Sequence, residues 1–200
     1  MAQLAELLVQ TSEMHHHLCP RQVLGVRMGM LAGELLHLDL PQADKRLFTF
    51  VETDGCFADG VAVATGCTLG HRTMRLMDYG KVAATFVDSE TAAAIRIFPH
   101  LSSREAAANL LPDISSRWQA MLEAYQQLPI DLLYQWQSVS LRIDLKALIS
   151  RHGLRVNCTS CGEEILNERE IEIDGQPYCR SCAGDAYYVH APEAVAGSQS

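Results

Sequence analysis

The sequence lacks any apolar segment of the roughly 20 residues that a membrane-spanning helix needs. It also lacks an excess of positive charge, since 16 Lys and Arg residues stand against 24 Asp and Glu residues and the formal net charge is −8. Binding to nucleic acid or to an anionic membrane depends on basic side chains, so this balance argues against both as main partners. Residues 1–14 have neither the basic start nor the cleavage site of a signal peptide, so we expect a cytoplasmic protein.

Repeats and low-complexity segments are also missing, except at the end of the chain. Hydrophobic residues make up 48% of the sequence and charged residues 20%, which is typical of a globular protein with one substantial domain and room for a smaller unit. Residues 191–200 are rich in Ala, Gly and Ser and read as a flexible tail. We therefore predict a core domain over 1–150, a small unit over 154–190 and the tail, with the boundary near 150–153.

The small unit is predicted from its cysteines. Seven cysteines would indicate disulfides in a small secreted protein, but four of them form two CxxC pairs separated by 17 residues. These are Cys158, Cys161, Cys179 and Cys182. Two thiolate pairs at this spacing are typical of a closed, tetrahedral zinc site, whereas four unrelated buried cysteines would not be paired in this way.

The residues between and after these pairs predict the shape of the zinc unit. The segment 165–178 reads as a β-hairpin that turns at Asp174 and Gly175, and the residues from Arg180 onward have a pattern compatible with a helix. A hairpin followed by a helix, both held by one ion, is the outline of a treble-clef zinc finger.

Charge indicates what this finger does. Between Leu154 and His190 there are 3 basic and 7 acidic residues, so the formal charge is −4 before the thiolates are counted. Such a module offers few phosphate contacts, which makes DNA recognition the weakest of the available functions. A unit of about 40 residues has too small a core to fold alone, and structural zinc contributes about 10 to 16 kcal/mol to folding.

Hydrophobic periodicity and turn residues predict an α+β core, with a mainly antiparallel sheet and flanking helices. The expected helices are 4–14, 23–38, 57–65, 103–111 and 115–127. The expected strands are 46–51, 73–77, 81–87 and 94–98, with 73–77 and 81–87 forming a hairpin around Asp78, Tyr79 and Gly80. The segment 132–143 is ambiguous, but its later half, with alternating Trp136, Val139, Leu141 and Ile143, favours a last strand.

A second group of potential ligands lies between the first two helices, in the sequence HHHLCP at 15–20. In an extended segment His15, His17 and Cys19 would project to one side. Cys19 also precedes the start of a helix, where free backbone N–H groups favour the thiolate that binds a metal or attacks an electrophile. The alternative is a solvated histidine loop.

A fourth ligand is available from Cys56 or Cys67, which bracket the helix expected at 57–65. The length of that helix would separate the two by about 16 Å, so one ion is not expected to bind both. We favour Cys56, because it also lies at a helix start. Cys67 would then line the pocket or pack in the core, and a buried apolar role is the alternative for either cysteine.

Several of these segments together resemble the FmdE family, which takes its name from a component of formylmethanofuran dehydrogenase. They are HxHxCP at 15–20, TDGCFAD at 53–59, TGCTLG at 65–70, DYGKVA at 78–83 and the four-cysteine unit that follows. The resemblance implies an α+β core with a His/Cys metal site or active site, an auxiliary treble-clef finger and a homodimer.

The resemblance also implies which residues form the site. The positions carried over are His15, His17, Cys19, Cys56, Asp59, Cys67 and Lys81. This chain departs from the usual pattern at His16, where a small residue is expected, and at His71, where a lysine is common. Either histidine would crowd the site or supply an extra ligand.

Two functions from different classes follow. In the first, His15, His17, Cys19 and Cys56 hold a second metal ion, expected to be zinc, and the site acts on or holds a small ligand. Cys19 would be a thiolate nucleophile or ligand, Asp59 an acid, a base or a support for a ligand, and Lys81 would bind an anionic group or be a solvated surface lysine. In the second, the protein is a non-enzymatic adaptor or metallochaperone for a molybdenum or tungsten enzyme, docking through its finger. The chain itself has no iron–sulfur cysteine run and no pterin-binding signature, so formyl oxidation is not expected of it.

Overall fold

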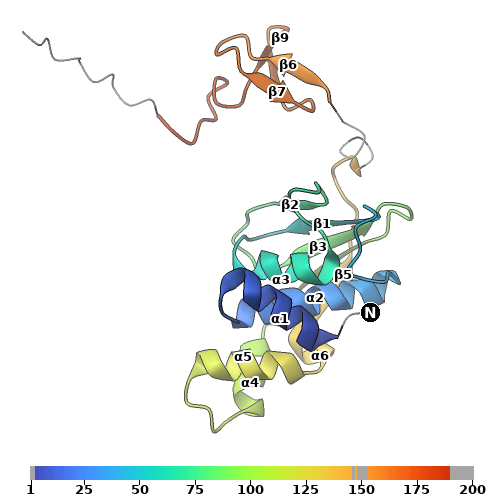
Figure 1. Ribbon diagram of the computed structural model, residues 1–200, viewed down its shortest axis with the longest axis vertical. Helices are drawn as coiled ribbons and strands as arrows, with labels where there is room; N and C mark the ends of the chain where they lie inside the picture. The colour runs from blue at the N-terminus through green and yellow to red at the C-terminus, as the bar shows by residue number, and fades with distance from the viewer. Residues whose placement is uncertain (1–2, 146, 148–152, 190–200) are drawn as a thin grey trace, which may run out of the picture. The chain divides into compact units, whose positions relative to one another are not determined.

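The computed structural model describes residues 3–145, 147 and 153–189 and divides the chain into two compact units, Met1–Arg142 and Ile143–Ser200 (Figure 1). Each unit is described by itself below. Of the boundary expected at 150–153 only Gly153 belongs to the described residues, and the tail predicted at 191–200 lies outside them.

The N-terminal unit contains both helices and strands in the proportions that the sequence predicts. Its helices are α1 Leu4–His15, α2 Pro20–Leu36, α3 Cys56–Thr65, α4 Ser103–Leu110, α5 Arg117–Gln127 and α6 Ile130–Leu133. Its strands are β1 Leu47–Val51, β2 Met74–Leu76, β3 Ala84–Asp88, β4 Ala94–Pro99 and β5 Tyr134–Ser138. In the ambiguous segment, the strand therefore begins at Tyr134, earlier than expected, and follows one short helical turn.

The five strands form one sheet in the order β2-β1-β3-β4-β5. Three of the four strand pairs are antiparallel, and only β1 and β2 are parallel, with Thr49 opposite Met74. A parallel pair needs a crossover, and α3 provides it between β1 and β2. The predicted class, α+β with a mainly antiparallel sheet, is confirmed.

The hairpin expected between 73–77 and 81–87 is wrong. Both strands exist, but β1 lies between them and pairs with each. The intervening segment bends across the end of β1, where the backbone N–H groups of Tyr79 and Lys81 both donate to the carbonyl of Glu52. Turn chemistry at 78–80 therefore marks a change of direction, but it does not identify which strands are neighbours.

Helix α2 forms the centre of this unit. It is buried along nearly its whole length, as expected for a helix that is apolar on most sides. It carries a glycine at every fourth position, Gly25, Gly29 and Gly33, and therefore presents a smooth face. On this face α3 approaches backbone to backbone, since a Cβ at Gly25 would lie 2.3 Å from the carbonyl oxygen of Phe57 and one at Gly60 would lie 2.4 Å from that of Gln22.

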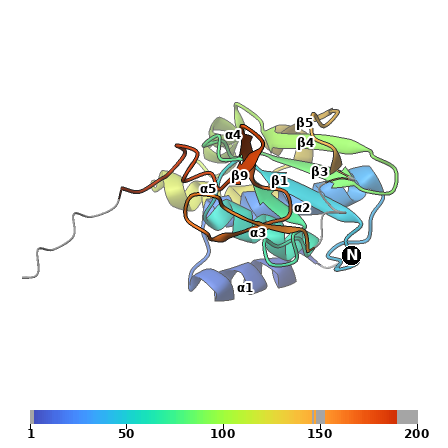
Figure 2. The ribbon, with the colours of Figure 1, turned by 90° about the horizontal axis from the view of Figure 1, so that it is seen from above.

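The sheet, the pair α2 and α3, and the pair α4 and α5 form successive layers of the N-terminal unit (Figure 1). Seen from above, α1 lies along one side of this unit, and it packs against α2 and α3 (Figure 2). Buried polar contacts fix the layers to α2. Arg27 donates to the carbonyls of Tyr125 and Leu128 at the end of α5, both at 2.7 Å, and Tyr134 OH donates to the carbonyl of Leu24 at 2.7 Å.

A buried carboxylate fastens β1 to β3. Arg46 donates from two nitrogens to the two oxygens of Asp88, at 3.0 and 2.8 Å, and the backbone N–H of Glu90 and the hydroxyl of Thr91 donate to the same carboxylate. The bonds from Arg46 hold the pKa of Asp88 well below its usual range.

The C-terminal unit contains two small antiparallel sheets. In the first, β6 Arg155–Asn157 pairs with β7 Glu164–Leu166, and in the second, β8 Ile171–Ile173 pairs with β9 Gln176–Tyr178. The predicted turn at Asp174 and Gly175 is confirmed, and both residues have positive φ. The hairpin is shorter than predicted, because Ile165 belongs to β7 and is buried against the first sheet.

The helix expected from Arg180 onward is not formed. Residues 180–184 make hydrogen-bonded turns, and no helix is assigned within 153–189. Gly184, which has a positive φ, interrupts the helical pattern that the alanines alone had indicated. Among the residues that the structure describes, no helix has the length and apolar character needed to cross a membrane.

The α2–α3 crossing generates a prediction. Replacing Gly60 with Ala adds one methyl group against backbone atoms that cannot move aside independently, so the free energy of unfolding should fall by about 3 kcal/mol or more. Gly70→Ala is the matched control, because the added Cβ would meet only Thr68 Oγ1 at 4.0 Å. Urea denaturation of both variants makes the comparison, and equal stabilities would show that the close approach is not a constraint.

The Arg46–Asp88 pair generates a second prediction. Because the folded-state pKa of Asp88 lies below its unfolded value of about 3.9, its contribution is fully present above about pH 5 and is lost as the pH falls through the folded-state pKa. Asp88→Asn should therefore destabilise the protein by about 2 kcal/mol at pH 7 and by progressively less toward pH 3. Urea denaturation at pH 7, 5 and 3 tests this, with the exposed Asp113→Asn as control. A difference that does not shrink with acid would contradict it.

Candidate metal centre

The candidate centre lies where α1 ends and α3 begins. His15 is the last residue of α1 and Cys56 is the first residue of α3. The turn before Cys56 depends on Gly55, whose backbone angles, φ 71° and ψ −155°, lie in a region that side chains disfavour. The sequence TDGC therefore places a thiol on the first turn of a helix that begins directly after a buried strand.

His15 connects two groups of α3 through its two ring nitrogens. Its Nε2 lies 2.9 Å from Cys56 Sγ and its Nδ1 lies 3.1 Å from Asp59 Oδ2. Cys56 and Asp59 are three positions apart on the helix, so both side chains reach the same side. When Nδ1–H donates to the carboxylate, Nε2 is left with a free lone pair directed at the thiol, which is how a carboxylate commonly prepares a histidine for a metal ion.

His17 completes a group of three donors. Its Nδ1 lies 2.9 Å from the carbonyl oxygen of His15, and one donor atom from each of His15, His17 and Cys56 lies within 4.8 Å of the others. From usual Zn–N and Zn–S bond lengths, donors on one tetrahedral ion lie about 3.6 Å apart. The three donors therefore fit a single ion of the zinc type, with only a small separation of His15 from Cys56.

The histidines converge in a different way from the one predicted. The expected extended segment is wrong, because His15 is still helical and His16 adopts a left-handed conformation with φ 58° that ends α1. His16 itself is exposed. The reversal at His16 turns His17 back over the end of the helix, so the two histidines meet through a turn and not through strand alternation.

Cys19 lies beside this group and is buried at the start of α2. Its backbone N–H donates to Gln22 Oε1 at 2.7 Å, and the Gln22 side chain in turn donates to the carbonyl of Thr11 in α1. Burial raises the pKa of the Cys56 thiol, and its hydrogen bond with Cys19 raises that pKa further. Cys19 Sγ does not belong to the group of donors within 4.8 Å, so it would become a fourth ligand only by moving closer to the histidines.

The remaining predicted residues lie apart from the group. Cys67 is buried at the other end of α3, where its thiol donates to the carbonyl of Leu47 at 3.3 Å and burial raises its pKa. Lys81 and His71 are exposed in loops. The packing role foreseen for Cys67 is thus the one the structure describes.

A cavity of about 460 Å³ opens beside the two cysteines. It is lined by Cys19 and Cys56 and by residues from α2, α4 and α5, among them Arg21, Arg104, Trp118 and Tyr125. Sequence reasoning missed the contribution of α4 and α5 to this site. The only local signal was an arginine in the first turn of a helix, a position where the helix dipole disfavours positive charge.

The four finger cysteines form the second cluster. One sulfur from each of Cys158, Cys161, Cys179 and Cys182 lies within 4.8 Å of the others. Backbone N–H groups of Cys161 and Cys179 lower the pKa of Cys158 to about 6, so this thiol is largely a thiolate at neutral pH. Four sulfurs at this separation are suited to one tetrahedral ion.

Comparison with family models finds two matches. Residues 14–135 match the family described as FmdE, Molybdenum formylmethanofuran dehydrogenase operon, and residues 153–188 match the Prokaryotic dksA/traR C4-type zinc finger. The first match covers more than half of the chain and includes His15, Cys56 and Asp59. The second spans all four finger cysteines.

Two known proteins are similar to this chain. A "Probable S-adenosyl-L-methionine-binding protein" from Archaeoglobus fulgidus is 37% identical over 100 residues, which make up 48% of this chain and 27% of that protein, so the match spans about a quarter of the relative's length. The crystal structure of an FmdE-like protein of the tungsten formylmethanofuran dehydrogenase type, from Syntrophus aciditrophicus, superposes with a TM-score of 0.62 at 22% identity, over 94% of this chain and 96% of that one. The α+β core with its His/Cys group and the finger that follows it thus carry the two family patterns in order, and the chain belongs to the FmdE family, with a C4-type zinc finger in its C-terminal unit.

Proposed function

We propose that the core binds a metal ion, expected to be zinc, through His15, His17 and Cys56, and that this centre acts on or holds a small ligand in the adjoining cavity. A second, structural zinc is bound by the four cysteines of the finger. The observation that carries the proposal for the core is the group of three donors within 4.8 Å, with His15 oriented by Asp59.

A metal ion accounts for this arrangement better than a free thiol does. The line Cys56, His15, Asp59 would also serve a thiol nucleophile with a histidine base. However, burial and Cys19 raise the pKa of Cys56, which disfavours the reactive thiolate. A bound dication reverses this effect because it stabilises the thiolate as a ligand.

The two clusters differ in the number of protein ligands they offer, and this difference supports different roles. Four cysteines complete the coordination of a zinc ion in the finger, as in structural sites. Three donors in the core leave one position for water, for Cys19 or for a ligand. A metal ion with an open position polarises a bound carbonyl or lowers the pKa of a bound water, and Asp59 would keep His15 in the tautomer that binds it.

The names of similar proteins do not extend this proposal. The Syntrophus aciditrophicus protein is 22% identical, so the likeness concerns the fold, and an adaptor role for a molybdenum or tungsten enzyme has no support among the described residues beyond it. The Archaeoglobus fulgidus relative matches over 27% of its length, and its S-adenosylmethionine binding is not transferred.

The first test is the metal content of untagged protein, purified without chelator and measured by plasma mass spectrometry. We expect about two ions per chain in the wild type and about one in Cys56→Ala, because the remaining core donors are too few to retain the ion. Cys67→Ala is the matched control and should retain both ions. One ion in all three proteins would refute the core site and leave only the finger occupied.

Asp59 provides a second test. Replacing it with Asn removes the carboxylate that orients His15 without removing a ligand, so the affinity of the core for zinc should fall by about 10- to 100-fold while the site can still be filled. Competition with a fluorescent zinc chelator measures this change. Asp54→Asn, an exposed carboxylate two positions before Cys56, is the control and should leave the affinity unchanged. Equal affinities of the two variants would contradict the role of Asp59.

A further inference from the structure

The cavity beside Cys19 and Cys56 has the size of a ligand site. Its volume of about 460 Å³ lies within the range of about 300 to 1,000 Å³ that small-molecule sites occupy. Its walls come from the first turns of α2, α3 and α4 and from one side of α5. The lining residues include Arg21 and Leu24 of α2, Arg104 of α4, and Trp118, Met121 and Tyr125 of α5.

The charge of this cavity is opposite to that of the protein. The chain as a whole carries a formal charge of −8, yet the cavity is lined by two arginines and by no aspartate or glutamate. Neither Arg21 nor Arg104 forms an ion pair with a carboxylate within the part of the chain that the structure describes, although Arg104 contacts the hydroxyl of Tyr125. Two guanidinium groups around one cavity favour an anion, because their planar N–H groups match carboxylate and phosphate oxygens.

The positions of these arginines are unfavourable for the helices themselves. Arg21 lies in the first turn of α2 and Arg104 in the first turn of α4. A positive side chain there opposes the helix dipole, at a cost of about 0.3 to 1 kcal/mol each. A bound anion would offset this cost by pairing with both arginines.

The rest of the lining is apolar and aromatic. Leu24, Val82 and Met121 provide aliphatic surface, and the indole of Trp118 lies half exposed at the cavity. Exposed aromatic and methionine side chains of this kind bind flat or flexible apolar groups. The ligand that matches both parts of the lining is therefore acidic at one end and apolar at the other.

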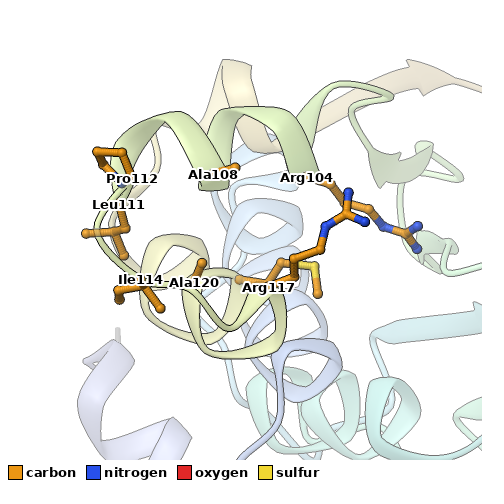
Figure 3. A pocket seen from close by; sticks show the side chains of 8 residues that line it. Arg104, Ala108, Leu111, Pro112, Ile114, Arg117 and Ala120 are labelled. Carbon is orange, nitrogen blue, oxygen red and sulfur yellow. The ribbon is translucent and has the colours of Figure 1, made fainter.

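A neighbouring pocket separates the role of this cavity from that of positive charge in general. It has a volume of about 270 Å³, lies between α4 and α5 and is lined by both Arg104 and Arg117. Figure 3 shows the side chains of these two arginines extending toward the same end of the pocket, away from Leu111 and Pro112. Arg117 does not line the larger cavity, so it provides an arginine of the same charge and similar location outside it.

We propose that the larger cavity binds a small organic anion whose acidic group is held by Arg21 and Arg104 and whose apolar or aromatic part lies against Trp118 and Met121. This deepens the proposed function, on which it rests for the identity of the site, by naming the class of its ligand. Because Cys19 and Cys56 line the same cavity, the anion would be held within reach of the proposed metal ion.

Phenylacetate is a suitable probe, and phenylacetamide is its neutral counterpart of the same shape. The chain has 2 tryptophans, so the indole N–H signals of ¹⁵N-labelled protein report on Trp118 at the cavity, with Trp136 on β5 as an internal reference. Phenylacetate should shift the Trp118 signal saturably and leave that of Trp136 unchanged. Phenylacetamide should bind at least about tenfold more weakly, because it lacks the charge that pairs with the arginines.

Variants test the two arginines. Arg21→Gln and Arg104→Gln should each weaken phenylacetate binding by about tenfold or more, whereas Arg117→Gln should change it by less than about threefold. Equal binding of the amide, or an equal loss in Arg117→Gln, would overturn the proposal, since binding would then depend on shape or on general charge.

Metal content measured on the same samples separates this proposal from the proposed function. Arg21→Gln and Arg104→Gln should retain the metal content of the wild type, so their loss of binding would be due to the anion site. Phenylacetate binding by a protein that holds metal only in its finger would refute the core metal site and still support the anion cavity. Metal in the core with no response of Trp118 to phenylacetate would refute the anion cavity alone.

Discussion

The close crossing of α2 and α3 is the constraint on which the rest of the core depends. Gly25 and Gly60 allow two helical backbones to meet without intervening side chains. The contacts run in the same direction along both helices, from Gln22 with Gly60 to Gly29 with Ala64, so the two N-terminal ends lie at the same end of the pair. Cys19 precedes the first helix and Cys56 begins the second. The fold therefore brings together two thiols that are distant in sequence, before any ligand contributes.

The groups around this crossing act at increasing distance from the proposed ion. His15, His17 and Cys56 offer donor atoms, and Asp59 fixes the orientation of His15. Gln22, fully buried, joins the start of α2 to α1 through Cys19 and Thr11 and so fixes the loop that carries the histidines. The helices α4 and α5 then complete the cavity with cationic and aromatic side chains. The centre thus depends on all three layers of the N-terminal unit, whereas the finger cluster is assembled by local turns alone.

Much of this architecture could be predicted from sequence because the signals are local. Apolar periodicity identified the main helices and strands, and the CxxC spacing identified the finger ligands. The hairpin at 73–87 was wrong because strand order depends on β1, which is remote in sequence. The helix after Arg180 was wrong because Gly184 ends a pattern that composition alone supports. The choice of Cys56 over Cys67 agreed with the donor group in the structure, since a helix start and a helix end lie far apart. Arg21 and Arg104 could not be assigned to the cavity, because nothing in their own segments shows that α4 folds back against the start of α2.

The contact between His15 and Cys56 has a consequence for the chain as a polymer. The two residues are 41 positions apart and belong to different helices, so an ion bound by both is a cross-link that closes a loop containing all of α2 and β1. A permanent cross-link of this length would lower the entropy of the unfolded chain by the equivalent of about 4 kcal/mol at 25 °C. Helix α1 has few buried side chains of its own, Leu7, Leu8 and Thr11, and so gains most from such a tether. Occupancy of the centre would be read out at the N-terminal helix as a change in how firmly that helix is attached.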